Sequence, residues 1–413
     1  MSEAYRVAGI DVHKSMLAVV VTDVREGGEF RFQRRKFGTV DSQVKMMSHW
    51  LGELGVREAV MESTAQYWKP VWRQLEGQCQ LYLAQAQSNR APRGRKQDFQ
   101  DAERLVRRHV AGELILSFVP DAEQRLWRTI TRTKHQLTRD RVRLQNQLES
   151  FLEDAQLKLG TCVSDLLGVS SQRMLRAIAE GQGDPRELAA LADVNLRATP
   201  EQLADALPAA GTLTALHRRI LKLFLDRLDL IDSQLKTLHQ QIAQALHQHQ
   251  QAVIRLAAMP GFGVDLAQQV IAEVGATAAS FASPQQLASW VGVCPGREES
   301  AEVSKSNRSP KGNRMMRRVL NQGANAAVKT KGSIFQLHYR RLLARVGHNK
   351  AIWAIAHRLC KLAWIILHRG IDYVEYGTER NLQALKRRTT RQLRELRALG
   401  YQVIPPPNTE QSA

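Results

Sequence analysis

Short apolar and alternating runs near the N-terminus predict an α/β domain. Five runs have the length and the β-branched or alternating composition of strands: residues 7–10, 16–21, 30–37, 59–61 and 79–83. Residues 44–54 have helical spacing and separate the third run from the fourth. The first part of the chain is therefore expected to hold a mixed sheet with helices.

Heptad spacing predicts two long helices in the middle of the chain. The first, within residues 121–157, repeats every seven residues through Ile130, Leu137, Leu144 and Phe151, with Leu148 at a half-step. The second has steps of three and four through Leu221, Phe224, Leu228, Ile231, Leu235, Leu238 and Ile242. Such a seam is typical of a coiled coil, which could close as a hairpin within one chain or pair two chains. Between the helices, Pro185 and Pro200 are expected to break the regularity.

A helix, a glycine-rich turn and a second helix begin the C-terminal part. The turn contains Pro260, Gly261, Phe262 and Gly263, and an apolar helix is expected at residues 266–274. This order is typical of a helix-hairpin-helix, in which glycines let the backbone approach a phosphate closely. Gly261 and Gly263 are therefore candidate nucleic-acid contacts, with a plain turn as the alternative.

The charge balance favours a polyanionic partner. The chain has 59 Lys and Arg against 40 Asp and Glu, a formal charge of +19. Nucleic acid matches this excess, because each neutralised phosphate releases counterions. The alternatives are an ordinary basic protein and a ribosomal or membrane-surface binder. No Asp or Glu occurs in residues 303–371, a one-signed stretch that needs an anion nearby. Its candidate nucleic-acid-binding cations are Lys305, Arg308, Lys311, Arg314, Arg317 and Arg318.

The cysteines and the apolar runs indicate in which cellular compartment the protein is expected. The four cysteines, at positions 79, 162, 294 and 360, include no close pair, which fits neither a zinc motif nor a disulfide framework. The first residues lack the apolar core of a signal peptide. No apolar run approaches the ~20 residues that a membrane span needs. We expect a cytoplasmic protein without membrane contact.

Four acidic residues stand where the predicted elements could bring them together. Three early strands, a helix and further strands is the order of an RNase H-like (RuvC-like) fold, an inference that carries no chemistry by itself. Asp11 and Glu62 each end a predicted strand, and neighbouring strand ends meet at one sheet edge. Asp98 and Asp101 share one face if their segment is helical. Clustered carboxylates favour Mg²⁺, with Mn²⁺ as the alternative ion, and such ions serve phosphodiester chemistry.

Each acid taken singly also has a structural explanation. Asp11 could cap a turn, Glu62 could pair with Lys69, and Asp98 could cap a helix with Asp101 in its first turn. Their joint placement on successive elements favours the metal site. His13 is expected to be a surface neighbour, and Glu103 points away from the Asp98 and Asp101 face.

Taken together, the motifs resemble those of a transposase family of bacterial insertion sequences. Its members pair an N-terminal DEDD domain, similar to Holliday-junction resolvases, with a C-terminal serine-bearing domain. The front motifs are residues 9–14, 61–64, and Lys96, Asp98, Asp101 and Ala102. The rear motifs are residues 259–263, 286–292, 295–300, 309–314, and Arg317 and Arg318. Their order and separation carry the resemblance, whereas residues 121–250 share only the family's helical character.

The resemblance implies a domain division and a set of site residues. The domains are expected at 1–118 (RNase H-like), 119–250 (coiled-coil oligomerisation region), 251–372 (mainly helical transposase domain) and 373–413 (basic tail). By this similarity Asp11, Glu62, Asp98 and Asp101 form a metal-binding tetrad, and Ser300 is the nucleophile. The family usually has glycine where Ala301 stands, so Ser304 and Ser306 remain substitutes. Family members are guided by a bridge RNA, act as dimers or tetramers, and have a DNA invertase branch.

The chemistry gives a separate reason for a serine. A serine that attacks phosphorus keeps the phosphodiester energy in a covalent link, which a DNA end can later reverse. Lys305, Arg308 and Lys311 are near Ser300 in sequence and could stabilise the developing charge. Two other hypotheses stay open: a metal-dependent junction nuclease that uses no serine, and a silent nucleic-acid-binding protein with structural carboxylates.

Overall fold

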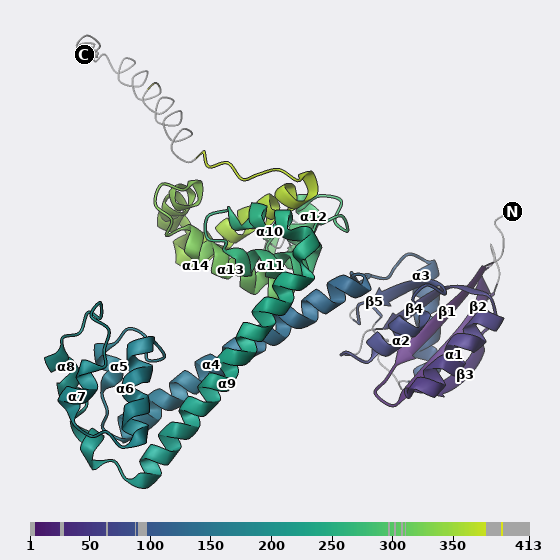
Figure 1. Cartoon of the computed structure of the whole chain (residues 1–413). Helices are drawn as coiled ribbons and strands as arrows, with labels where there is room; N and C mark the ends of the chain where they lie inside the picture. The colour runs from purple at the N-terminus through teal and green to yellow at the C-terminus, as the bar shows by residue number, and fades with distance from the viewer. Residues whose placement is uncertain are drawn as a thin grey trace. The chain divides into compact units, whose positions relative to one another are not determined.

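The computed structural model describes most of the chain, in two compact units. The described residues are 5–24, 29–62, 65–86, 88–89, 97–295, 298–300, 303–306, 309, 311–376 and 390, with side chains left out at 298–300 and 303–306. Unit 1 is Met1–Pro120 and unit 2 is Asp121–Ala413 (Figure 1). The finer division of unit 2 into a coiled-coil region and a transposase domain stays a prediction.

Unit 1 is built on a five-stranded mixed sheet. Its strands are β1 (Tyr5–Val12), β2 (Met16–Val24), β3 (Gln33–Gly38), β4 (Val56–Glu62) and β5 (Gln80–Ala84). The spatial order is β3-β2-β1-β4-β5, with β1 and β2 antiparallel, β2 and β3 antiparallel, and β1, β4 and β5 parallel. All five predicted strands are present, and the arrangement is consistent with the RNase H-like fold expected from the sequence.

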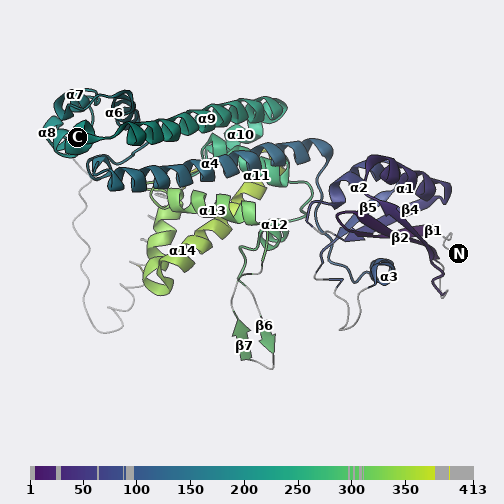
Figure 2. The same cartoon turned by 90° about the horizontal axis from the view of Figure 1, so that it is seen from below.

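Helices cover both faces of this sheet. On one face, α1 (Asp41–Glu53) and α2 (Trp68–Leu75) pack over a core that includes Ile10, Leu17 and Met61. On the other face, α3 (Asp98–Val110) covers Val7, Val20 and Val60 (Figure 2). Strand residues alternate between these two cores, as the two-residue period of a strand requires.

Gly9 allows α3 to lie directly against β1. A Cβ atom at this position would be 2.3 Å from the carbonyl oxygen of Ala102 and 2.7 Å from Val106 Cγ2. Such distances are shorter than van der Waals contact, so any side chain at position 9 would push the helix off the sheet. The lack of a side chain at Gly9 therefore determines how closely α3 packs against β1.

Unit 2 is almost entirely helical, and two long helices form its spine. α4 (Ala122–Asp154) and α9 (Ala215–Ala245) pack against each other within the chain, as the views in Figures 1 and 2 both show. Leu221, Leu228, Ile231 and Ile242 of the predicted seam are buried. The structure thus has α4 and α9 as a hairpin within one chain, and pairing with a second chain stays a prediction.

Short helices connect the two spine helices and close a separate core. They are α5 (Leu159–Cys162), α6 (Val169–Glu180), α7 (Pro185–Ala190) and α8 (Pro200–Asp205), followed by the 3-10 turn Pro208–Thr212. Pro185 and Pro200 each begin a helix instead of breaking one, because the first helical position needs no amide hydrogen. The expected irregular connection is thus an ordered helical cap.

Five further helices form the C-terminal part of unit 2. They are α10 (Gln250–Ala257), α11 (Val264–Val274), α12 (Pro284–Val291), α13 (Arg314–Ala327) and α14 (Ile334–Arg369), and a 3-10 turn at His247–His249 precedes α10. A two-stranded hairpin of β6 (Glu298–Ser300) and β7 (Val303–Ser306) connects α12 to α13 and extends away from the helices (Figure 2). α10 and α11 lie on either side of the glycine turn, in the order expected from the sequence.

The sequence analysis found no apolar run of membrane-spanning length, but α14 is long enough to cross a membrane. By length and composition alone this 36-residue helix could cross a bilayer, with a mean hydropathy of 1.2 in its most apolar window. However, 56% of that window is buried inside the protein, where Ile355 and Leu359 lie in the core. The helix is also interrupted at Gly347, whose φ of 75° is not helical. Core packing explains the apolar composition of α14.

We predict that Gly9→Ala destabilises unit 1. The added methyl group overlaps the backbone of α3, and such overpacking costs about 1–3 kcal/mol of unfolding free energy. Urea unfolding of the full chain measures the loss. Gly160→Ala is the matched control, because the nearest atom to its new Cβ is Glu149 Oε1 at 3.4 Å. Equal midpoints for the two variants would contradict the proposed contact.

Candidate functional site

The sheet register brings two of the predicted acids to adjacent strands. Ile10 of β1 is paired with Met61 of β4, so Asp11 and Glu62 come next on neighbouring parallel strands. Gly9 faces α3, and Asp11 lies two residues further along the same strand. Since strand residues two apart share a face, Asp11 points to the α3 side of the sheet.

The start of α3 supplies the other two acids. Asp98 and Asp101 lie in the first turn of this helix, which follows Gln97. Their negative charges are favourable there, because the amide groups of a helix N-terminus carry partial positive charge. The close packing of α3 at Gly9 holds this turn over the ends of β1 and β4.

His13 links two of the acids. Its Nε2 atom lies 2.9 Å from Asp11 Oδ2 and 3.5 Å from Asp98 Oδ1. One ligand atom from each of Asp11, His13 and Asp98 lies within 4.8 Å of the others. Lys36 Nζ is 3.3 Å from the second oxygen of Asp98. The side chain of His13 is 45% exposed, so it lies at the surface beside the acids, as the sequence suggested, and its nitrogen is near enough to join them around an ion.

Glu62 and Asp101 are held by a second set of partners. Asn89 Nδ2 donates to Glu62 Oε2 at 2.7 Å. Arg104 pairs with Asp101 and donates from Nε to the backbone oxygen of Asn89 at 3.1 Å. One Asn and one Arg thereby orient both carboxylates, in the way that outer partners orient metal ligands. Sequence reasoning missed Asn89 and Arg104, although Arg104 is one helical turn from Asp101.

The acids affect one another electrostatically. Burial raises the pKa of the Asp11 carboxyl above its ordinary value, since only 7% of the residue is exposed. His13 lowers this pKa by its charge and hydrogen bond, and the negative charges of Glu62 and Asp101 raise it. The net effect is a raised pKa, so a cation bound beside Asp11 would favour its ionised form.

The donor set fits a divalent cation. Asp11 and Asp98 offer hard oxygen ligands, Glu62 and Asp101 add negative charge nearby, and His13 offers a nitrogen. Carboxylate oxygens suit Mg²⁺ and Mn²⁺. Glu103 pairs with Arg34 at 2.6 Å and is not among the groups that affect the Asp11 carboxyl. Its position away from the cluster agrees with the sequence analysis.

The predicted serine lies at the end of β6 in unit 2. Ser300 pairs with Val303 across the β6–β7 hairpin. Ser304 and Ser306, the alternatives, are on β7. Only the backbone of these residues and of Lys305 is described, and Arg308 lies outside the described residues. The role of the hairpin in catalysis stays a prediction.

The candidate cations after the hairpin fall into two groups. Lys311 and Arg314 are exposed. Arg317, in contrast, donates to the backbone oxygen of Gly292 and lies 4.5 Å from the ring centre of Trp353. Arg318 donates to Gln269, and burial lowers its pKa. Arg317 and Arg318 thus have intramolecular partners, whereas Lys311 and Arg314 form no ion pair with a residue in the described part of the chain.

A buried carboxylate anchors the segment that leaves the hairpin. Glu273 of α11 is 2% exposed and accepts two hydrogen bonds from Arg132, of 2.9 and 3.0 Å. Arg128 Nε lies 3.4 Å from the same carboxylate, and Asn313 Nδ2 donates to it at 3.0 Å. Asn313 also caps α13 through its side-chain oxygen. One acid therefore ties α4 and α11 to the base of the hairpin.

The two glycines of the predicted helix-hairpin-helix differ in their surroundings. Gly261 has a φ of 78°, and a Cβ there would be 2.3 Å from the backbone oxygen of Gly323 in α13. Close helix packing therefore explains the glycine at 261. Gly263 has no atom within 4 Å of its Cβ position and precedes the first turn of α11. Phosphate binding at this turn stays a prediction, with Gly263 the more accessible position.

We predict that Asp11→Asn weakens Mn²⁺ binding by at least about tenfold, because a neutral amide replaces the buried carboxylate between His13, Glu62 and Asp101. Calorimetric titration with Mn²⁺ measures this. In the unsubstituted chain, binding should fall as pH decreases, beginning at a higher pH than for an ordinary aspartate, because a protonated Asp11 cannot bind the ion. Glu103→Gln is the control and should bind Mn²⁺ normally. If Asp11→Asn titrates like the unsubstituted chain, Asp11 is not a ligand.

Comparison with known proteins agrees with this architecture. A family model described as Transposase, for the DEDD type of IS110 elements, matches residues 8–156, and the model described as Transposase IS116/IS110/IS902 family matches residues 253–340. The "Insertion element IS900 uncharacterized 42 kDa protein" of Mycobacterium paratuberculosis is 28% identical over 144 residues, 35% of this chain and 36% of that protein. The "Transposase for insertion sequence element IS1111A" of Coxiella burnetii is 32% identical over 123 residues, 29% of this chain and 34% of that protein.

The chain thus spans about a third of the length of each of these two relatives. The two family models lie in the order in which the acidic site and the hairpin occur, and together they cover more than half of the sequence. The chain belongs to the IS110/IS116/IS902 family of transposases.

Proposed function

We propose that this protein is a transposase that cuts and rejoins DNA strands. The observation that carries the proposal is the cluster of Asp11, His13 and Asp98, with Glu62 and Asp101 near enough to affect the Asp11 carboxyl. A divalent ion, Mg²⁺ or Mn²⁺, would supply charge neutralisation for the phosphodiester and activation of the attacking oxygen. The residues of the chain would orient that ion: Asp11 and Asp98 directly, and Asn89 and Arg104 through Glu62 and Asp101.

The attacking oxygen is assigned to Ser300. In the first step its Oγ forms a bond to phosphorus, its proton leaves to solvent or a base, and one DNA oxygen departs as a hydroxyl. In the second step a hydroxyl of the new DNA partner attacks the phosphoserine and restores the serine. No net hydrolysis occurs, which distinguishes this reaction from that of a nuclease. Lys311 and Arg314 are exposed beyond the hairpin and suit the DNA backbone.

The partners follow from the family resemblance and from charge. A structured guide RNA is proposed as the source of target specificity, because base pairing would then select the site while the protein reads backbone and shape. The cytoplasm is the proposed compartment. Transposition of an element and inversion of a segment use the same chemistry, and an invertase is the alternative within this function.

Exposed leucines support an assembly of two or four chains. Leu216, Leu223 and Leu230 recur every seven residues on α9 and are 65%, 57% and 58% exposed. They lie outside the seam that α9 shares with α4. An exposed apolar stripe of heptad period is the surface that a coiled-coil partner covers. In such an assembly Ser300 of one chain could meet the carboxylates of another.

We expect the unsubstituted protein to become covalently joined to DNA when strand exchange is trapped, and Ser300→Ala to form no such product. Denaturing gels with end-labelled DNA measure the covalent species. Ser304→Ala and Ser306→Ala are the matched controls and should still form it. Removal of co-purifying RNA by nuclease should abolish the reaction if a guide is required; full activity without RNA removes that part of the proposal.

The outcomes separate the alternatives. Normal cutting by Ser300→Ala with no covalent product in any variant would identify a metal-dependent nuclease. Unchanged cellular activity of Asp11→Ala would identify a nucleic-acid-binding protein with structural carboxylates.

We also predict that Leu223→Lys combined with Leu230→Lys lowers the oligomeric state, because two charges would be buried against a partner chain. Light scattering after size exclusion measures the mass. Leu126→Lys, on α4 and 56% exposed, is the control outside the stripe. Retention of the full assembly by the double variant would show that another surface joins the chains.

A further inference from the structure

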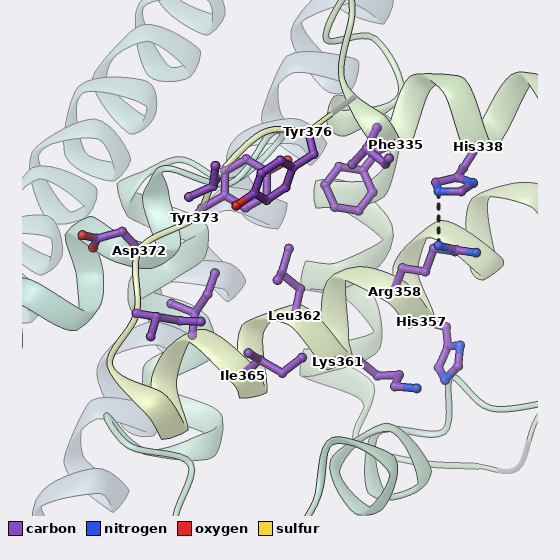
Figure 3. Close-up of a pocket in the computed structure, with 14 residues that line it drawn as sticks. Phe335, His338, His357, Arg358, Lys361, Leu362, Ile365, Asp372, Tyr373 and Tyr376 are labelled. Atoms are coloured by element: carbon purple, nitrogen blue, oxygen red, sulfur yellow. Dashed lines mark hydrogen bonds between the residues drawn. The ribbon is translucent and has the colours of Figure 1, made fainter. Parts of the chain in front are cut away.

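A cavity of about 880 Å³ lies between α14 and the segment that follows it (Figure 3). The chain turns at Gly370, whose φ is 64°, and residues 371–376, here called the strap, return along the helix. Glu375 holds the strap by accepting from the Ile334 amide at 3.0 Å and from the Tyr373 hydroxyl at 2.6 Å. Asp372 lies 3.4 Å from Arg255 of α10. The cavity is thus built by ordered contacts within unit 2.

The floor and one side of the cavity are apolar and aromatic. The apolar side chains come from both halves of α14 and from the strap: Phe335, Leu362, Ile365, Ile366, Ile371 and Val374. Tyr373 and Tyr376 lie over α14 on the same side as Phe335 (Figure 3). Flat rings above an aliphatic floor are suited to a planar ligand, and the volume is in the range of small-molecule sites.

Cationic side chains gather at one end of the same cavity. Arg358, Lys361, His338 and His357 lie there, and Asp372 lies at the opposite end (Figure 3). Arg358 Nη1 lies 3.3 Å from His338 Nε2, and neither Arg358 nor Lys361 forms an ion pair with any residue that the structure describes. Burial lowers the pKa of His357, and the positive charges of Lys361 and Arg358 lower it further.

The carboxylates of the strap are already engaged. Glu375 accepts from Ile334 and Tyr373, and Asp372 pairs with Arg255. Among the described residues, the cavity lining therefore offers no carboxylate that complements the cationic end, and an anion from another molecule fits there. The chain beyond the strap is a poor candidate, because residues 377–413 carry more Lys and Arg than Asp and Glu. A planar group joined to a phosphate matches both ends of the cavity.

We propose that this cavity binds one unpaired nucleotide of a nucleic-acid strand. Its base would stack on the tyrosines of the strap, and its phosphate would lie beside Arg358 and Lys361. Base stacking on aromatic side chains, combined with cations along the backbone, is the general way in which proteins hold unpaired strands. The inference rests on the proposed function only in assuming that the protein meets nucleic acid.

Photocrosslinking with single-stranded oligonucleotides tests the site. Oligonucleotides that carry one 4-thiothymidine (DNA) or one 4-thiouridine (RNA) are irradiated with the full chain, and the attached peptide is identified by mass spectrometry. We expect attachment within the strap. Leu362→Trp puts an indole on the cavity floor, where the base would lie. It should strongly reduce this crosslink and weaken single-strand binding by about tenfold, the effect of one lost stacked base. Leu343→Trp, on the same helix, 40% exposed and outside the lining, should change neither.

A second variant keeps the test informative if Leu362→Trp unfolds. Arg358→Gln removes an exposed charge and should weaken binding and reduce the slope of its salt dependence by about one. The oligonucleotide that crosslinks, DNA or RNA, identifies the source of the nucleotide. Crosslinks outside the cavity, or crosslinks unaffected by both variants, overturn the proposal. Because crosslinking measures binding and the covalent trap at Ser300 measures strand exchange, either proposal can fail without the other.

Discussion

The packing of one helix on one strand is the constraint on which the candidate site depends. α3 reaches the sheet only because Gly9 has no side chain, and a Cβ there would overlap the backbone at Ala102. This contact puts Asp98 and Asp101 beside Asp11 and Glu62, although the two pairs come from separate elements. Four carboxylates at close range repel one another, so the fold brings them together against electrostatics. Core burial on both sides of the sheet supplies the opposing free energy.

Much of unit 1 could be predicted from the sequence, because its strands carry strong apolar patterns. The five strands and the acids at their ends follow from periodicity and position. The partners of those acids do not: His13 and Asn89 lie in irregular or exposed segments, where no pattern indicates a contact. The order of β1 and β4 in the sheet, which makes Asp11 and Glu62 neighbours, depends on tertiary packing. The sequence indicated only that neighbouring strand ends could bring the two acids together.

Unit 2 shows where charge and composition mislead. The 59 Lys and Arg include arginines that already have a carboxylate partner within the protein, such as Arg132 at Glu273 and Arg141 at Asp232. Arg317 and Arg318 belong to a basic run, yet they have partners within the chain. Gly261 fits a phosphate-binding motif by sequence, and the structure gives it a packing role against α13. A sequence pattern identifies arginines and glycines that could bind a ligand. It does not show which of them already contact other residues of the folded protein.

The Glu273 cluster has a consequence for the synthesis of the chain. Arg132 leaves the ribosome 141 residues before the glutamate that neutralises it. At about 5–20 residues per second, this interval is on the order of ten seconds. During that time the arginines of α4 lack the carboxylate that they pair with in the finished protein, so the nascent chain presents a cationic segment to any polyanion nearby, ribosomal RNA included. Docking of α11 ends this period, and Asn313 joins the cluster last, which makes the base of the hairpin the final part of this network to be secured.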